Sequence, residues 1–301
     1  MHRLTMLFAR AVVVGAMGAA AIAATGGSTA LASSPCGHTS RAPAWRHIVV
    51  IAFENHSYEQ ILGRTAPASY FKTLASKCGS AADYRAAHFP RSLPNYMAAT
   101  GGRIVTTSDC LPGPDCVSGG PNIFSQLGGL HWRTFAESMP TPCDSQDTSL
   151  YVPRHVPALY YLRIPHVVCR RNVVALPAHR IKLRRTFTWI APNLQHDMHD
   201  GSLAQASRWL QAFLGGSHGL LHRHPYVDGH TAVFVWFDSA GGNGSVTTPI
   251  PFIVISPSTP HKLALKPLNQ YSALRGWEGM LGLPCIGSAC DVNGTRLPFH
   301  L

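Results

Sequence analysis

The chain has 301 residues, of which 46% are hydrophobic and 13% are charged, and its formal net charge is +11. This composition is that of one globular domain with enough apolar side chains for a substantial core. The positive charge does not indicate nucleic-acid binding, because the basic residues are scattered along the chain. Only the segment 163–185 resembles a basic patch, and it lacks the interleaved aromatic side chains that stack on bases. We therefore expect no nucleic-acid partner.

The first 32 residues have the pattern of a secretory signal peptide. Arg3 and Arg10 precede the apolar run 11–24, and the small-residue site Ala30-Leu31-Ala32 follows it. This run is too short to anchor the chain across a bilayer, and no other apolar stretch approaches the required length, so no stable membrane insertion is expected. An uncleaved membrane anchor is the alternative. We expect a secreted, extracellular protein in which residues 33–301 form a single domain.

Strand-like and helical segments alternate along the rest of the chain. Apolar, β-branched runs predict strands, and apolar residues at helical spacing predict helices. In chain order these are strand 47–53, helix 69–78, strand 187–191, helix 202–214, and strands 231–237 and 251–256. This alternation predicts an α/β fold with a mainly parallel sheet covered by helices on both faces. The segment 103–185 shows little periodicity and is predicted to form a disulfide-stapled insertion, a substrate-selecting lid over the strand ends.

The chain has eight cysteines, an even number that agrees with an oxidising destination. Cys110/Cys116 and Cys285/Cys290 are close in sequence, and each pair brackets a turn rich in Gly and Pro, so we predict a disulfide within each pair. By elimination, the other disulfides are Cys36–Cys78 and Cys143–Cys169. A zinc site is the competing interpretation, but no pair has C-x-x-C spacing.

Polar residues follow three of the predicted strands. Glu54-Asn55 follows strand 47–53, the segment 192–200 follows strand 187–191, and Asp238-Ser239 follows strand 231–237. For each group alone, the alternative is that it merely caps the next helix, and for Asp200 capping is the favoured interpretation. Ligands of open parallel sheets gather at these strand ends, however, and several carboxylates at one edge repel each other unless a cation neutralises them. The sequence therefore predicts a bound divalent metal ion that polarises a phosphoryl oxygen.

A serine stands at the start of a predicted helix. The segment Ser92-Leu93-Pro94-Asn95-Tyr96 begins a short helical pattern that Gly101-Gly102 closes, and we expect Ser92 to occupy the N-cap. Free N–H groups and the helix dipole at that end favour an anion. A hydroxyl aimed at an anion, together with acids that hold a cation, indicates phosphoryl chemistry.

These segments resemble the motifs of the secreted bacterial phosphoesterase family, which groups acid phosphatases with phospholipase C-type enzymes and has the alkaline phosphatase-like fold. The resemblance spans about residues 45–285, and it is specific because separate segments occur in the family's order. The segments are Glu54-Asn55-His56-Ser57-Tyr58 with Ile61-Leu62-Gly63, Ser92-Leu93-Pro94-Asn95-Tyr96, Pro192-Asn193-Leu194 with Asp197-Met198-His199-Asp200, and Tyr271-Ser272-Ala273-Leu274-Arg275 with Glu278 and Leu281-Gly282-Leu283.

The resemblance implies a role for each matching residue. Ser92 would be the catalytic nucleophile, Asn95 an amide that binds the oxyanion, and His199 an acid/base group. The divalent metal ion would be bound by Glu54, Asn55, Asp238 and Asp197. The implied partner is a phosphate-ester substrate, and the implied activity is metal-dependent phosphoric ester hydrolysis by a phosphatase or a phospholipase C-like enzyme.

Two positions depart from the family pattern. Ser239 stands where the family usually has a second carboxylate, and Gln270 stands where a His commonly precedes the Tyr271 segment. Losing these ligands should weaken metal binding. One hypothesis is therefore an enzyme with a reduced, single-metal site. The alternative is a catalytically degenerate member that binds anionic or phosphorylated ligands without hydrolysis. A triad-type serine hydrolase is a weaker option, because no Gly-x-Ser-x-Gly elbow surrounds Ser92.

Overall fold

The structure, a computed structural model, describes residues 1–2, 34–178, 181–294 and 296–301. Except for Met1 and His2, the predicted signal peptide lies outside these residues, and the boundary of the mature domain stays a prediction. Among the described residues, no helix combines the length and the apolar character that crossing a bilayer requires.

The main sheet is assembled from strands that are far apart in the sequence. The strands are β1 His47–Phe53, β2 Gly79–Ala81, β3 Tyr84–Arg85, β4 Trp132–Ala136, β5 Val173–Ala175, β6 Phe187–Ala191, β7 Thr231–Phe237, β8 Pro249–Ile250, β9 Phe252–Ile255, β10 Lys262–Ala264 and β11 Leu268–Asn269. The main sheet has the order β10-β2-β9-β7-β1-β6-β4-β5, and a small sheet has the order β11-β3-β8. In the main sheet, pairing is parallel except at β9, which runs antiparallel to β2 and β7. The predicted mainly parallel sheet is confirmed.

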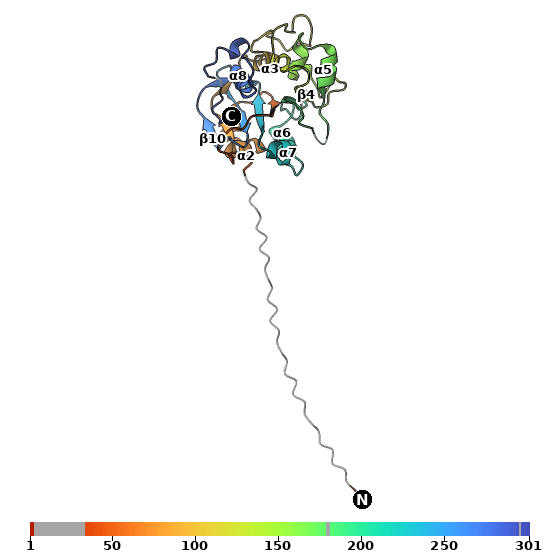
Figure 1. The fold of residues 1–301 in the computed structure, drawn as a ribbon, viewed down its shortest axis with the longest axis vertical. Helices are drawn as coiled ribbons and strands as arrows, with labels where there is room; N and C mark the ends of the chain where they lie inside the picture. The colour runs from red at the N-terminus through yellow and green to blue at the C-terminus, as the bar shows by residue number, and fades with distance from the viewer. Residues whose placement is uncertain (3–33, 179–180, 295) are drawn as a thin grey trace. The chain divides into compact units, whose positions relative to one another are not determined.

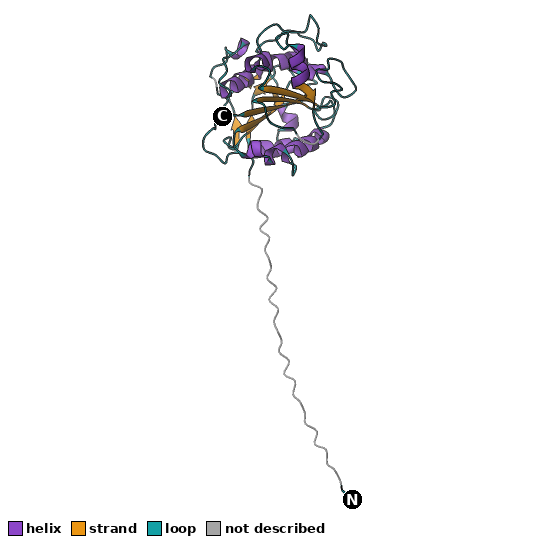
Figure 2. Cartoon of the chain, turned by 45° about the vertical axis from the view of Figure 1, so that its right-hand side comes forward, coloured by secondary structure: helices purple, strands orange, loops and turns teal. Residues whose placement is uncertain are grey.

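Helices cover both faces of this sheet. The α-helices are α1 Tyr58–Ile61, α2 Tyr70–Lys77, α3 Ser92–Gly101, α4 Ile123–Leu127, α5 His166–Asn172, α6 Leu203–Leu210, α7 His224–Val227 and α8 Gln270–Met280. Short 3-10 helices are η1 Pro153–His155, η2 Pro157–Tyr160, η4 Leu220–His222 and η5 Gly287–Ala289, and a π-helical turn, η3, spans Gln211–Gly215. Figure 1 shows α3, α5 and α8 on one side of the strands and α2, α6 and α7 on the other, and Figure 2 shows helices on two sides of the strands.

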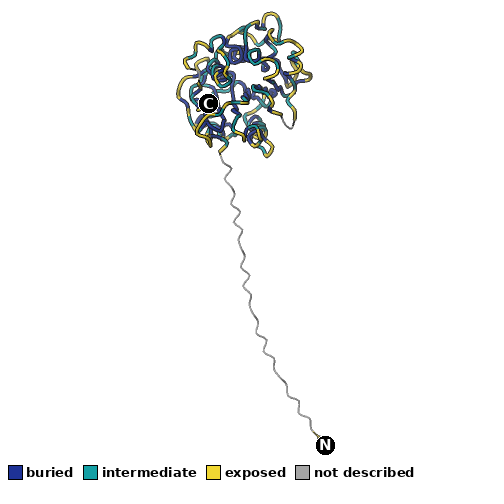
Figure 3. The backbone as a smooth tube through the Cα atoms, in the orientation of Figure 1, coloured by how far each residue is buried: buried dark blue, intermediate teal, exposed yellow. Residues whose placement is uncertain are grey.

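The central strands form where the sequence is apolar without interruption. The predicted strands 47–53, 187–191 and 231–237 coincide with β1, β6 and β7, and 251–256 contains β9. Their residues are buried on both faces, except for His47 at the start of β1, as expected for parallel strands between two helical layers. Figure 3 shows this buried centre in dark blue. The predicted helix 69–78 is α2, and 202–214 comprises α6 and the π-helical turn that follows it.

The segment 103–185 is more regular than its sequence indicates. It supplies β4 and β5, which extend the main sheet beyond β6, so the expectation of an insertion lying outside the sheet was wrong for these strands. Both strands are short, and Arg133 interrupts the apolar pattern of β4, which explains why periodicity did not reveal them. The other described residues of the segment form mainly loops and short helices, and its role as a lid stays a prediction.

All four predicted disulfides are present. They join Cys36 to Cys78, Cys110 to Cys116, Cys143 to Cys169 and Cys285 to Cys290, and no cysteine is free among the described residues. Two of them lie within the segment 103–185, so the expectation of a disulfide-stapled segment is confirmed. Such cross-links stabilise loops mainly by restricting the unfolded chain.

Candidate active site

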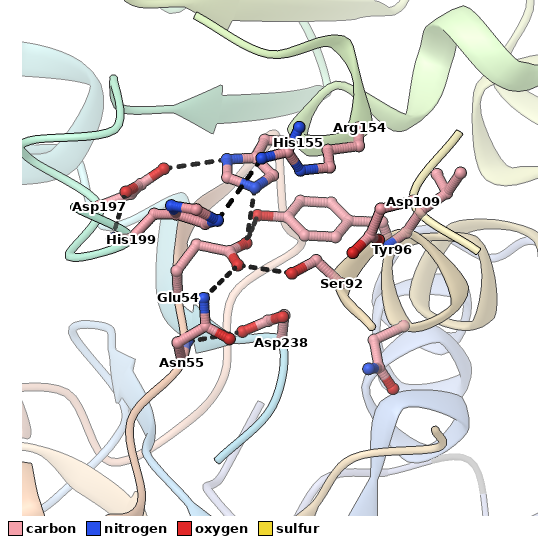
Figure 4. Close-up of polar contacts among 12 residues, drawn as sticks. Glu54, Asn55, Ser92, Tyr96, Asp109, Arg154, His155, Asp197, His199 and Asp238 are labelled. Carbon is pink, nitrogen blue, oxygen red and sulfur yellow. Dashed lines mark hydrogen bonds and ion pairs between the residues drawn. The ribbon is translucent and has the colours of Figure 1, made fainter. Parts of the chain in front are cut away.

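The carboxyl ends of β7, β1 and β6 bring the predicted acidic residues together. These strands are neighbours in the sheet, so Glu54, Asp197 and Asp238 meet at one edge, as Figure 4 shows. The backbone N–H of Glu54 donates to the carbonyl oxygen of Asp197 over 2.8 Å. The backbone N–H of Asn55 donates to Oδ1 of Asp238 over 2.9 Å. The loops that follow the strands are therefore tied directly to one another.

The backbone at this edge adopts conformations that few residues accept. Asn55 has φ 57° and Met198 has φ 76°, both in the left-handed region that is uncommon outside glycine. Gly241, with φ +63°, lies so close to the first loop that a Cβ atom would come within 2.2 Å of the carbonyl oxygen of Asn55. The loop after β7 thus packs tightly on the loop after β1. Unusual backbone of this kind is concentrated at functional sites.

Ser92 is the first residue of α3, and Arg91 occupies the N-cap, so the predicted capping role of Ser92 was wrong. No side-chain bond caps the helix from Arg91; instead, Asp109 of the segment 103–185 accepts the N–H of Leu93 over 2.9 Å. The start of the helix is thus capped by a carboxylate that is sixteen residues away in the sequence. The hydroxyl of Ser92 is therefore free to donate elsewhere, and it donates to Oε2 of Glu54 over 2.7 Å.

The carboxylate of Glu54 is fully buried and accepts hydrogen bonds on both oxygens. Besides Ser92, the hydroxyl of Tyr96 donates to its Oε1. Burial, and then the nearby charges of Asp238 and Asp197, raise the pKa of Glu54 well above its usual value. Burial likewise raises the pKa of the Tyr96 hydroxyl, so this group stays a neutral donor. Glu54 thus joins the serine to the cluster of acids.

A histidine that sequence reasoning missed lies between two of these acids. Nδ1 of His155 is 2.9 Å from Oδ2 of Asp197, and its Nε2 is 3.4 Å from Oε1 of Glu54. The His155 ring stacks on Tyr96 with centroids 5.5 Å apart and an interplanar angle of 3°. Burial lowers the pKa of His155 to about 3, so the imidazole is neutral and carries one N–H between two carboxyl groups. Burial raises the pKa of Asp197 to about 8.

Arg154 and His199 form the more open side of the site. Nη2 of Arg154 lies 3.5 Å from Nε2 of His199, and Oδ1 of Asp200 lies 2.7 Å from Nδ1 of the same ring. The backbone N–H of His199 donates to Oδ1 of Asp197 over 2.8 Å. The His199 side chain is 30% exposed, whereas that of His155 is 3% exposed. Of the two imidazoles, His199 is therefore the one that a substrate can reach.

Asn95 does not join this group. Its Oδ1 accepts the backbone N–H groups of Ala87 and His88, and its Nδ2 donates to the carbonyl oxygens of His88 and Arg91. All of these bonds hold the loop that precedes α3, and the side chain is fully buried. The geometry therefore favours a positioning role for Asn95 over the oxyanion-binding role that the resemblance implies.

The two departures from the family pattern are buried beside Asp238. Nε2 of Gln270 donates to the carbonyl oxygen of Asp238 over 2.8 Å and to that of Phe237 over 3.2 Å. Its Oε1 accepts from the Tyr84 hydroxyl and the Trp236 indole. The hydroxyl of Ser239 donates to Oδ1 of Asn55 over 3.4 Å. Both side chains thus hold neighbouring site residues in place.

The donor atoms at this edge suit a divalent cation chemically. Oδ2 of Asp238 and Nε2 of His155 are buried and have no hydrogen-bond partner. Three buried carboxyl groups with no buried lysine or arginine beside them favour a cation that neutralises them. Within the described residues, however, no group of three or more His, Cys, Asp or Glu side chains surrounds a common point as metal ligands do. Asp197 already uses both oxygens within the protein.

Sequence reasoning missed Tyr96, Asp109, Arg154 and His155 as site residues. Tyr96 was visible within the Ser92 segment, but one helical residue gives no signal that it points toward a distant carboxylate. Pro153-Arg154-His155 lies in a non-periodic segment, where only the occurrence of two basic residues between apolar ones could have drawn attention to it. Their position in the site depends on long-range contacts that no local pattern encodes.

Comparisons with known proteins show the family of this chain. The Phosphoesterase family model matches residues 66–284. A protein of Mycobacterium tuberculosis named phosphatidylinositol-3-phosphatase is 26% identical over 306 residues, which cover 96% of this chain and 93% of that protein.

Two solved structures are similar in fold. An alkaline phosphatase superfamily protein from Vibrio parahaemolyticus has a TM-score of 0.54 at 10% identity, covering 86% of this chain and 72% of its own. The protein Ps i-CgsB has a TM-score of 0.52 at 12% identity, covering 84% of this chain and 75% of its own. At these identities the two structures show the fold alone, and the predicted alkaline phosphatase-like architecture is confirmed.

Proposed function

The chain belongs to the Phosphoesterase family and is a phosphoric ester hydrolase, and from this premise we propose that it hydrolyses phosphate monoesters through Ser92 as a covalent nucleophile. The observation that carries the proposal is the 2.7 Å hydrogen bond from Ser92 to Glu54 inside the buried cluster of acids. The name of the Mycobacterium tuberculosis relative, which describes removal of a phosphate group, supports a monoester as the substrate class.

The first half of the reaction would transfer the phosphoryl group to Ser92. Oγ of Ser92 attacks phosphorus in line with the leaving oxygen, and its proton passes to Oε2 of Glu54, the acceptor that it already contacts. The raised pKa of Glu54 makes this carboxylate a better proton acceptor. Protonated His199 donates a proton to the leaving alkoxide, and Arg154 beside it offers N–H donors to a phosphoryl oxygen.

The second half would release phosphate and restore the serine. Water attacks the phosphoserine and gives a proton to His199, while Glu54 returns its proton to the departing Oγ of Ser92. His155 would act as a positioning residue, because it lies between Glu54 and Asp197 and has almost no exposed surface. The net change is one ester and one water converted to one alcohol and one phosphate, so protons balance over the cycle.

We further propose that Glu54, Asn55 and Asp238 hold a divalent cation. When bound, such an ion would neutralise charge on the phosphoryl group and lower the pKa of the serine hydroxyl. The unpartnered Oδ2 of Asp238 supports this role. Glu54 and Asp197 each use both carboxylate oxygens in hydrogen bonds within the protein, so either one would have to share an oxygen with a bound cation. Ser239 and Gln270 reduce the number of charged ligands, which supports a single-metal site.

We also propose that the protein is secreted and that the segment 103–185 acts as a lid over the site. The four disulfides, which use all eight cysteines, support secretion, since such bonds persist in oxidising compartments. The segment 103–185 supplies Asp109, Arg154 and His155 to the site, which supports its role in selecting substrates.

The alternative, a protein that binds phosphorylated ligands without hydrolysing them, rests on Ser239 and Gln270. Incubation of the purified mature protein with para-nitrophenyl phosphate and with bis-para-nitrophenyl phosphate separates the two functions. We expect turnover of the monoester, slower turnover of the diester, and loss of activity with chelator that an added divalent cation restores. Binding of phosphate without turnover under any metal condition would support the alternative instead.

A further inference from the structure

The proposed reaction leaves a strongly basic part of the chain unexplained. Between Asp147 and Asp197 the sequence contains no acidic residue. The basic residues in this interval are Arg154, Arg163, Arg170, Arg171, Arg180, Lys182, Arg184 and Arg185. Among those that the structure describes, only Arg154 lies in the proposed catalytic site. The others would be expected to spread over a solvated surface, but the fold gathers two of them.

Strand register brings Arg171, Arg133 and Arg185 to one edge of the sheet. Arg171 precedes β5 by two residues, Arg133 is the second residue of β4, and Arg185 precedes β6 by two residues. Strands β5, β4 and β6 are parallel neighbours that pair at these same ends. Figure 1 shows α5, which carries Arg171, beside β4. This edge is where the strands begin, whereas Ser92 and the acids lie where the strands end.

A single loop holds two of the guanidinium groups. Nη2 of Arg171 donates to the carbonyl oxygen of Gly129 over 3.0 Å, and Nη1 of Arg185 donates to that of Leu130. Arg133 follows this loop directly and is half-buried. Burial, and then the nearby charges of Arg185 and Arg171, lower the pKa of Arg133. The loop at Gly129 and Leu130 thus brings two cations close to Arg133.

Among the described residues no carboxylate pairs with these arginines, and the one aromatic contact is that of the Arg133 guanidinium, 5.8 Å from the centre of the Phe135 ring. The arginine–carboxylate ion pairs among the described residues involve Arg85, Arg91 and Arg154, and none involves these three. Nε of Arg133 is buried without a hydrogen-bond partner, which is costly for a charged group. Guanidinium groups bind phosphate oxygens through paired N–H donors, and an oxyanion would satisfy both the charge and the free donors.

We propose that Arg133, Arg171 and Arg185 form a second oxyanion site, which binds the phosphate group of a soluble phosphate or of an anionic lipid head group. The site is separate from the Ser92 centre and does not depend on the proposed mechanism. The side chain of Leu130 at the same loop is 59% exposed, so a lipid surface would meet an apolar group beside the three cations.

Arginine side-chain NMR tests the site directly. Protein labelled with ¹⁵N-arginine is titrated with inorganic phosphate, and the Nε–H signals are assigned with single Arg→Gln variants. We expect the signals of Arg133, Arg171 and Arg185 to shift along one saturating curve, while those of Arg170 and Arg184 stay in place. In a second arm, the protein is sedimented with phosphatidylcholine vesicles with and without phosphatidylserine. If the protein sediments only with vesicles that contain phosphatidylserine, the ligand is an anionic lipid head group. If the arginine signals respond to inorganic phosphate but the protein does not sediment, the ligand is a soluble phosphate.

Two double variants that lose the same net charge distinguish a specific oxyanion site from nonspecific attraction to a basic surface. The double variant Arg171→Gln/Arg185→Gln should bind inorganic phosphate or phosphatidylserine vesicles at least about tenfold more weakly, because two of the three cations are removed. Arg170→Gln with Arg184→Gln removes the same charge from exposed neighbours and should leave binding unchanged. Hydrolysis of para-nitrophenyl phosphate should be equal in both, which shows that the fold is retained. If the first pair fails to fold, each single variant is measured instead. Equal weakening by both pairs, or no response to phosphate or vesicles, would overturn the proposal.

Discussion

The hydroxyl of Ser92 donates to Oε2 of Glu54 over 2.7 Å, and this bond joins the start of α3 to the end of β1. Tyr96, one helical turn after Ser92, donates to the other oxygen of the same carboxylate. Two hydroxyls from one helix face therefore hold a buried acid whose neighbours are themselves acids. This arrangement places the proposed nucleophile beside a proton acceptor.

Replacing His155 should impair catalysis although the residue has almost no exposed surface. His155→Ala removes the ring that separates Glu54 from Asp197, so we expect kcat/KM for para-nitrophenyl phosphate to fall about 10- to 100-fold. The exposed His222 provides a control, and His222→Ala should retain wild-type activity. Full activity in His155→Ala would contradict a positioning role for this ring.

Gln270 should act through the backbone of Asp238. Gln270→Leu leaves buried partners without hydrogen bonds and should lower the free energy of unfolding by about 1–3 kcal/mol, measured by urea denaturation. We expect kcat to fall with it. Gln270→His introduces the family residue but cannot donate to both carbonyl oxygens, so it should also stay below wild-type activity. Tighter metal binding in Gln270→His would instead identify position 270 as a lost ligand.

Asp109 should compete with phosphate at the start of α3. Its carboxylate occupies the N–H of Leu93, an amide of the kind that binds anions at helix N-termini. Asp109→Ala frees this amide and removes a negative charge, so inhibition by inorganic phosphate should become stronger by about two- to fivefold. Asp115→Asn, an exposed change in the same segment, is the control. Weaker inhibition in Asp109→Ala would show that Asp109 assists anion binding.

The stability of the metal-free protein should fall as the pH rises. Burial raises the pKa of Asp197 to about 8 and raises that of Glu54 in the same direction. A carboxyl group with a raised folded pKa contributes stability that is fully present below its unfolded value, about 4, and is lost as the pH rises to the folded value. In chelator, these two acids should therefore lower Tm between about pH 4 and 8. Because burial lowers the pKa of His155 to about 3, this imidazole adds stability as the pH rises to its unfolded value, about 6.5, so the decrease in Tm should be clearest between about pH 6.5 and 8.

A bound cation should remove much of this decrease, because it stabilises the ionised carboxylates. Calorimetry with chelator and then with individual divalent cations measures the effect. Asp197→Asn should flatten the pH dependence in chelator, and the exposed Asp115→Asn should not. A Tm that does not fall between about pH 6.5 and 8 in chelator would contradict the uncompensated burial of these acids. Failure of every cation to raise Tm would contradict the metal proposal.

The sequence predicted the sheet because its central strands are encoded locally. β1, β6 and β7 are apolar and buried on both faces, so their residues alone identify them, and the polar residues that follow them mark the edge where ligands bind. β4 escaped detection because Arg133 breaks its pattern. Arg133 is the second residue of β4 and is only half-buried, and Arg171 and Arg185 lie nearby. A charged side chain is therefore tolerated at this end of the strand.

The site was predictable only in part, because local sequence patterns identify only the residues that follow the strands. Glu54, Asp197 and Asp238 follow recognisable strands, but His155 and Arg154 reach them from a 3-10 helix whose position is set by tertiary contacts. Ser92 was misplaced at the N-cap because local preference favours serine there. The capping bond comes instead from Asp109, sixteen residues beyond Leu93, and no local preference predicts such a partner.

The most direct test of the account is to trap the phosphorylated enzyme. Wild-type protein is mixed with substrate and quenched in acid, and the phosphopeptide is identified by mass spectrometry. Phosphate should be found on Ser92. Ser92→Ala should form no phosphoenzyme and lose turnover but still bind vanadate, since Arg154 and the proposed cation site remain. Hydrolysis by Ser92→Ala at the wild-type rate would contradict the covalent mechanism and leave direct attack by water.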